Sequence, residues 1–185
     1  MEDLFLKAKH WQFFVGFLGL SFIVQVFFSF SLILSDYASV LTILTGVIGG
    51  ASMFLFLSWF YYLIKGLNKK IQYHNLKTDS STLKLFYLFP VFYMLVIYWF
   101  FPLGFVVSTE ENSNINSLSM LIVAPAHLFS IFCVFYLMYK TAKTIKVAEV
   151  QKPVKFVDFA GEFFLLWFFP IGIWFLQPKI NKLAE

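Results

Sequence analysis

The fold of this chain depends on how one C-terminal stretch is placed, Glu162-Phe-Phe-Leu-Leu-Trp-Phe-Phe-Pro-Ile-Gly-Ile-Trp-Phe-Leu-Gln-Pro178. Its uninterrupted apolar part, Phe163 to Leu176, would measure about 21 Å as a helix. The hydrocarbon core of a bilayer is about 30 Å thick, and apolar runs this short more often re-enter or lie at the interface than span. We therefore predict a membrane-embedded segment over residues 156–176 that does not cross. A thin or tilted fifth transmembrane helix is the alternative.

Two features inside this segment and two lysines after it support the same prediction. Pro170 removes a backbone donor near the middle and Gly172 follows, a pair that predicts a bend. A segment that returns keeps Lys179 and Lys182 on the side from which it entered, whereas a span carries them across. The residues expected to shape a structural or interaction motif here are Trp167, Pro170, Gly172, Trp174, Gln177, Pro178 and Asn181.

Four other segments are long and apolar enough to cross a bilayer, which takes about 20 residues. They cover approximately residues 11–34, 38–64, 83–107 and 118–139. A composition of 60% hydrophobic and 13% charged residues leaves more apolar surface than a water-soluble domain of 185 residues can bury. The predicted fold class is all-α: a single polytopic membrane domain of four transmembrane helices plus the C-terminal re-entrant or interfacial helix.

The connecting segments alternate in charge, which predicts topology. Ser35-Asp36-Tyr37 and the loop from Ser108 to Asn116 are polar and acidic, whereas lysines collect before the first helix, after the second and after the fourth. Short lysine-rich loops stay in the cytoplasm. We therefore expect a multi-pass protein whose N-terminus is cytoplasmic, as an uncleaved signal anchor, and whose C-terminus is cytoplasmic too.

The residue types argue against several functional classes. All 14 cations are Lys and lie between apolar runs, so the net charge of +4 reflects topology rather than nucleic-acid binding. Cys133 is the only cysteine, which excludes an intrachain disulfide and a cysteine metal cluster. The sequence contains no phosphate-binding loop, metal-ligand spacing or nucleophile elbow. We expect no catalytic residues, no metal, no cofactor and no nucleic-acid partner.

Four polar residues form the candidate polar or ion site: Gln25, His127, Asp158 and Glu162. Asp158 and Glu162 are four apart and share a helix face. Acids within membrane segments often mark ion pathways, but acids at an interfacial helix start also suit the helix dipole, with Lys152 and Lys155 near enough to neutralise them. Both interpretations stay open. Gln25 and His127 suit hydrogen bonds between helices, and a proton relay is the alternative for His127.

The C-terminal third resembles a group of small polytopic inner-membrane proteins widespread in the Bacteroidota. The resemblance is carried by His127 to Cys133, Tyr139 to Lys146, Phe156 to Glu162 and Phe163 through Asn181, with the closing motif EFFLxWFFPIGxWxLQPxIN. The first two helices show no comparable signature. The resemblance implies a bacterial inner-membrane location and a functional or assembly role for the last segment. It implies no activity, because none is established for the group.

Three functional hypotheses follow. The leading one is a non-enzymatic membrane protein that acts as an accessory, assembly or interaction subunit, with its C-terminal segment contacting the lipid bilayer, a membrane-protein partner or a second copy. A small-residue patch on the second helix offers a further contact surface: Gly46, Gly49, Gly50, Ala51 and Ser52. The alternative is a small transporter or channel for protons or cations that uses Glu162, Asp158 and His127. The third is a membrane enzyme subunit that binds haem or quinone.

Overall fold

The computed structural model describes residues 2–33, 38–100 and 113–184, and every regular element within these ranges is helical. Four stretches are long and apolar enough to cross a membrane, judged by length and composition: His10–Phe30, Ile43–Lys70, His74–Ile97 and Leu121–Val150. The predicted all-α polytopic class is therefore confirmed. The predicted turn at residues 35–37 lies outside the described residues, as do residues 108–112 of the predicted acidic loop 108–116. The rest of that predicted loop, residues 113–116, is helical and begins α6.

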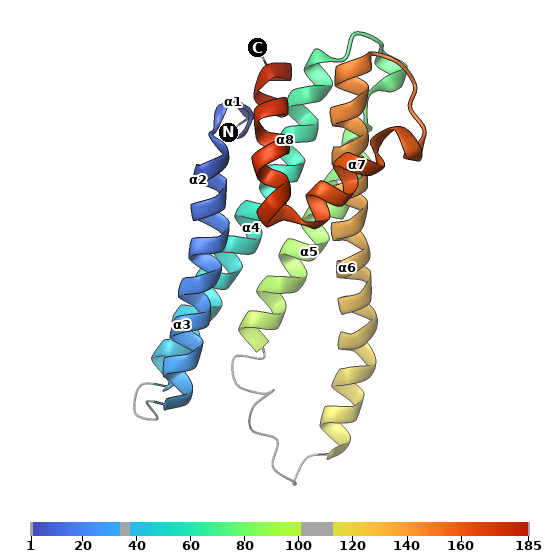
Figure 1. The fold of residues 1–185 in the computed structure, drawn as a ribbon. Helices are drawn as coiled ribbons and strands as arrows, with labels where there is room; N and C mark the ends of the chain where they lie inside the picture. The colour runs from blue at the N-terminus through green and yellow to red at the C-terminus, as the bar shows by residue number, and fades with distance from the viewer. Residues whose placement is uncertain (1, 34–37, 101–112, 185) are drawn as a thin grey trace.

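The spans form two antiparallel pairs that meet at α4 (Figure 1). The elements are α2 (His10–Phe14), the π-helical turn η1 (Val15–Gly19), α3 (Leu20–Ile33), α4 (Ala38–Lys70), α5 (Ser80–Phe100) and α6 (Ser113–Val150), with a short 3₁₀ turn, η3 (His74–Leu76), before α5. α2, η1 and α3 follow one another as a single rod, in which α3 packs along α4, and α5 packs along α6. α4 also contacts both α5 and α6, so it joins the two pairs.

Two helices extend further than their apolar runs predict. α4 continues to Lys70 rather than ending near residue 64, and α6 covers residues 113–150 rather than 118–139. Lysine side chains on the added turns can keep their amines in water while their stems cover apolar surface. The turns also bury Ala142, Ile145 and Val147. The hydropathy of the sequence predicts where a helix leaves the hydrocarbon core, whereas packing against other helices determines the residue at which the helix ends.

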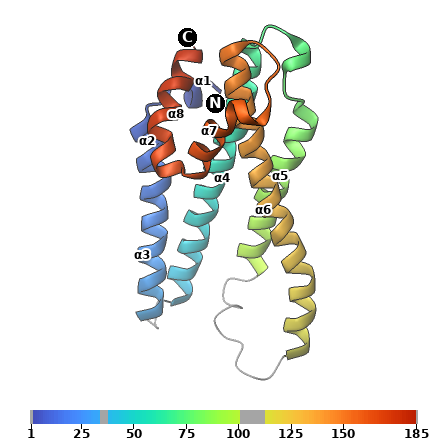
Figure 2. The ribbon, with the colours of Figure 1, turned by 45° about the vertical axis from the view of Figure 1, so that its right-hand side comes forward.

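The C-terminal segment folds as a helical hairpin. α7 (Phe156–Trp167) enters from the lysine-rich end, the chain reverses at Phe168, and α8 (Phe169–Ala184) returns to that end beside α1 and α2 (Figure 2). Helices of 12 and 16 residues measure about 18 and 24 Å, less than the hydrocarbon thickness. The structure therefore agrees with the predicted re-entrant element and not with a fifth span.

A short N-terminal helix, α1 (Glu2–Lys7), precedes the first span and was not predicted. It contacts α4 and α8, and its Phe5 and Leu6 are both buried. Leu6 lies directly over Gly66 of α4, where an added Cβ would meet the Leu6 side chain. The N-terminus is therefore part of the packed core.

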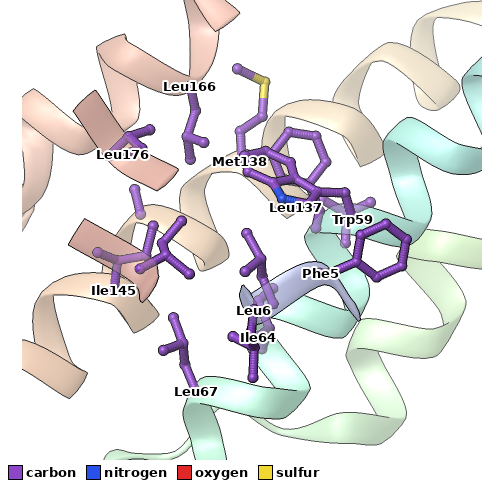
Figure 3. Close-up of a cluster of buried hydrophobic side chains, with 14 of the residues drawn as sticks. Phe5, Leu6, Trp59, Ile64, Leu67, Leu137, Met138, Ile145, Leu166 and Leu176 are labelled. Atoms are coloured by element: carbon purple, nitrogen blue, oxygen red, sulfur yellow. The ribbon is translucent and has the colours of Figure 1, made fainter. Parts of the chain in front are cut away.

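The buried core occupies one half of the molecule. We call residues 5–17, 57–84 and 133–184 the lysine half, because all 14 lysines lie within it, and residues 20–33, 38–55, 85–100 and 113–132 the far half. With the exception of Pro90 and Tyr93, every buried apolar side chain that the structure describes belongs to the lysine half. Figure 3 shows Leu166 and Leu176 of the hairpin in the same buried cluster as Leu137 and Met138 of α6 and Trp59 of α4.

Candidate functional site

The reversal between α7 and α8 lies two residues before Pro170. Phe168 has φ −86° and ψ 51°, and its carbonyl accepts from the backbone N–H groups of Ile171 (3.0 Å) and Gly172 (2.8 Å). Pro170 is the second residue of α8, where the first turn needs no N–H donor. The predicted bend is present, and proline opens the second helix rather than kinking a continuous one.

Gly172 allows the two arms of the hairpin to touch. A Cβ built at this position would overlap the backbone carbonyl of Leu165 in α7. Because backbone cannot move aside as a flexible side chain can, glycine is the residue that fits here. The closing motif thus requires a residue without a side chain at position 172, and Gly172 is buried between the two arms of the hairpin.

Phe169 anchors the tip of the hairpin in an aromatic cluster. Its ring lies 5.3 Å from that of Phe17, 5.2 Å from Phe56 and 5.4 Å from Trp59, measured between centroids, and each pair meets edge to face. This geometry is the one that aromatic quadrupoles favour. The tip is therefore held against both the first span and α4.

Gln177 and Asn181 fasten α8 to the N-terminus. Gln177 is fully buried, and its Nε2 donates to the carbonyls of Phe5 (3.0 Å) and Ala8 (3.1 Å) and to Asn181 Oδ1 (2.9 Å). Asn181 Nδ2 also donates to the Ala8 carbonyl at 3.2 Å. The last carbonyls of a helix lack partners within it, so these amides supply donors that the end of α1 needs. We call this set of bonds the amide clamp.

Lys179 fastens the other side of α8. Its Nζ lies 2.8 Å from Glu162 Oε1 of α7 and 2.9 Å from Glu149 Oε2 of α6, and Glu149 also pairs with Lys146 at 2.8 Å. Burial by itself would lower the pKa of Lys179, but its bonds with Glu162 and Glu149 outweigh burial and raise the pKa above the ordinary lysine value. Lys179 is therefore charged at neutral pH, and the ion pairs join three helices.

Asp158 and Glu162 have separate partners. The Asp158 carboxylate accepts from the backbone N–H of Lys155 at 2.7 Å, and the backbone N–H of Asp158 donates to the Lys155 carbonyl at 3.0 Å. These bonds close the start of α7 in the manner of a capping box. Asp158 is exposed and Glu162 is mostly buried beside Lys179, so the structure does not bring the two carboxylates to one ligand.

His127 and Gln25 lie in the far half, away from the hairpin. His127 Nδ1 is 3.1 Å from the Tyr93 hydroxyl, a hydrogen bond that joins α6 to α5, as one of the two interpretations of His127 predicts. Gln25 is exposed on α3. The four candidate polar residues therefore occupy separate places and do not line a common site.

The remaining motif residues lie on the surface of the hairpin. Trp167 contacts Phe135 of α6 at 5.1 Å between ring centroids, and Trp174 contacts His10 at 4.4 Å and Phe14 at 5.7 Å. Pro170 and Pro178 are exposed. Trp174 thus seals α8 against the first span, while Trp167 seals α7 against α6.

An apolar groove of about 250 Å³ separates α4 from α5 in the far half, lined by Gly50, Ala51, Met53, Phe54, Val91, Met94 and Leu95. Two of these residues belong to the small-residue patch of the second helix. Among the described residues, no three side chains of the His, Cys, Asp or Glu types gather in a metal-binding arrangement. The residues that line the groove offer apolar contact alone.

Comparisons of the chain with protein-family models, with curated proteins and with solved structures find no match. The site is therefore interpreted from its own geometry. Sequence reasoning missed the partners of the motif residues: the carbonyls of Phe5 and Ala8, and Glu149. The Lys146–Glu149, Lys155–Asp158 and Gln177–Asn181 contacts are three or four residues apart and carry a local signal. The contacts that join α8 to the N-terminus, to α6 and to α7 link residues that are distant in the sequence.

Proposed function

We propose that this protein is a non-enzymatic membrane protein that acts as an accessory, assembly or interaction subunit, and that the α7–α8 hairpin contacts its partner. One observation carries the proposal: the hairpin has two unlike faces. The inner face is fixed in the core by the amide clamp, the Lys179 ion pairs and the Phe169 aromatic cluster. The outer face is apolar and uncovered.

The outer face is large and aromatic. We define it by Trp167, Phe168, Ile171 and Phe175, which are 52%, 61%, 63% and 64% exposed. Aromatic side chains are enriched at the centres of protein interfaces. A surface that is already ordered also binds with a smaller entropic cost than a flexible one. A rigid aromatic face within one leaflet fits an apolar transmembrane helix, from a partner protein or a second copy.

The transport alternative draws less support from the geometry. Each residue that it needs has a structural partner: Glu162 pairs with Lys179, Asp158 caps α7 and His127 bonds Tyr93. Buried carboxylates in ion pathways lie beside a water-filled cavity or other titratable groups. The ion pair with Lys179 accounts for the burial of Glu162 without a water-filled cavity.

The test is co-purification of hairpin variants in a mild detergent. A tagged protein would be extracted from its native membrane, and stoichiometric companions identified by mass spectrometry. We expect a partner or a second copy to elute with the parent protein and to be lost from the triple variant Phe168→Ala, Ile171→Ala, Phe175→Ala.

The matched control is the triple variant Phe22→Ala, Leu88→Ala, Phe92→Ala, whose side chains are comparably exposed on the spans, at 70%, 56% and 68%. It should keep the companion, because it leaves the hairpin intact. A companion retained by the hairpin variant, or a parent protein that elutes alone as a monomer, would contradict the proposal.

A further inference from the structure

The connection between α6 and α7 combines exposed lysines with exposed apolar side chains. We call residues 152–157 the lysine turn; its sequence is Lys152-Pro-Val-Lys-Phe-Val157. Val157 is 84% exposed, the highest fraction among the large apolar side chains described, and Phe156 is 46% exposed. Unlike the exposed apolar residues of the spans, these two lie outside every candidate span, at the lysine-rich end. They lie instead at the start of the re-entrant hairpin, directly beside Lys155.

Hydrogen bonds hold the lysine turn at both ends. Before it, Gln151 adopts a positive φ of 54° and bonds across to α4: its Nε2 donates to the Lys70 carbonyl at 3.2 Å, and its Oε1 accepts from the Gln72 N–H at 3.0 Å. After it, the Asp158 carboxylate accepts from the Lys155 N–H at 2.7 Å. The turn is thus presented by fixed neighbours on α4 and α7.

The charge of the turn favours an anion. Lys152 and Lys155 are exposed, and the ion pairs described at this end involve Lys146 and Lys179 instead. Among the described side chains, Asp158 is the one acidic group bonded to the turn, and its carboxylate already accepts from the Lys155 backbone. Two cations against one carboxylate leave the turn positive.

We propose that the lysine turn binds an anionic phospholipid, with Lys152 and Lys155 at the headgroup phosphate and Phe156 and Val157 among the first methylenes of the acyl chains. A lipid matches both the lysines and the apolar side chains of the turn, because it offers a negative phosphate and an apolar chain a few ångströms apart. Lysines beside a membrane surface attract anionic lipids, and an adjacent apolar face fixes the depth of insertion. This inference does not depend on a protein partner at the outer face of the hairpin.

The test uses site-specific quenching by brominated lipids. Cys133 is fully buried, so Val157→Cys provides one exposed cysteine for a small apolar fluorophore. The labelled protein is placed in vesicles that mix phosphatidylglycerol with phosphatidylcholine, with one or the other lipid brominated. Each lysine near the surface contributes about 1 kcal/mol, or about fivefold, so we expect brominated phosphatidylglycerol to quench with at least a fivefold preference.

Two variants with the same change in charge locate the effect. Lys152→Gln with Lys155→Gln should lower the preference at least fivefold, whereas Lys77→Gln with Lys84→Gln, exposed lysines at the same end, should lower it less than twofold. All four lysines are exposed, and an unchanged unfolding temperature verifies that each variant is folded. Equal quenching by both lipids in the parent, or equal losses in the two variants, would overturn the proposal.

Discussion

The lysine half and the far half of this protein are held together by different means. In the lysine half, side chains from α1, α2, η1 and every helix from α4 to α8 converge on a buried core, and the amide clamp and the Lys179 ion pairs add polar contacts to it. In the far half, large side chains such as Phe22, Phe92 and Leu121 are about 70% exposed. Lipid tails solvate such side chains as well as protein does, so spans need few contacts there. The core is therefore concentrated at the lysine-rich end, where α1 and the re-entrant hairpin pack against the spans.

Gly172→Ala should produce the largest effect, because the new Cβ overlaps the Leu165 backbone and must open the hairpin. We expect a loss of about 3 kcal/mol of stability, at the upper end of overpacking effects. The measurement is the midpoint of unfolding in detergent. Gly161→Ala is the matched control on α7, where a Cβ meets nothing within 4 Å, and it should stabilise the helix by about 0.5–1 kcal/mol. Equal effects at the two glycines would refute the steric requirement.

Gln177→Ala should rank second. It removes the side-chain donor from the buried carbonyl of Phe5, which costs about 1–3 kcal/mol for a group left unsatisfied, whereas the Ala8 carbonyl keeps its bond from Asn181. Hydrogen exchange should speed up in α1 before it does in the middle of α4. Gln25→Ala, an exposed glutamine of the far half, should change stability by less than about 0.5 kcal/mol. Unaltered exchange in α1 would mean that the clamp does not hold the N-terminus.

The Glu162–Lys179 pair should contribute less, because both side chains keep some access to solvent, at 12% and 28%. A double-mutant cycle of Glu162→Gln and Lys179→Gln should give a coupling of about 1 kcal/mol. Proton and cation flux into protein-containing liposomes should be the same for Glu162→Gln and the parent. A flux that the parent supports and Glu162→Gln abolishes would restore the transport hypothesis.

The smallest effect belongs to the far half. Phe92→Ala removes a ring that is 68% exposed, and we expect stability to fall by less than about 0.5 kcal/mol. In the lysine half, Ile173→Val removes one methyl group from a side chain that is 1% exposed and should cost about 0.5–1.5 kcal/mol. Unfolding midpoints of the two variants give the comparison directly. Similar losses at both positions would remove the distinction between the halves.

Much of the fold was predictable because hydropathy and charge act locally. The four spans, the lysine-rich end and the re-entrant C-terminal segment follow from run length and lysine placement. A bend was predicted at Pro170, and the chain reverses two residues earlier, at Phe168. Helix α1 was missed because six residues carry no periodic signal, and its burial comes from contacts with α8, far along the chain.

The candidate site was less predictable, because the role of each side chain depends on partners that are distant in the sequence. Asp158 and Glu162 look alike at a spacing of four, yet one caps a helix and the other pairs across the hairpin. Lys152 and Lys155 were the expected partners of these acids by proximity, whereas Lys179 arrives at Glu162 only because the chain reverses. Gln177 gives no sign in the sequence of the carbonyls that it binds.

The most direct test of the re-entrant hairpin is the accessibility of single cysteines in sealed membrane vesicles. Lys9→Cys precedes the first span, Lys182→Cys lies near the end of α8, and Asp36→Cys, between the first two spans in the sequence, serves as the opposite-side reference. A membrane-impermeant maleimide should label Lys9→Cys and Lys182→Cys from the same side and Asp36→Cys from the other. Labelling of Lys9→Cys and Lys182→Cys from opposite sides would show that the C-terminal segment crosses the membrane and would contradict the hairpin.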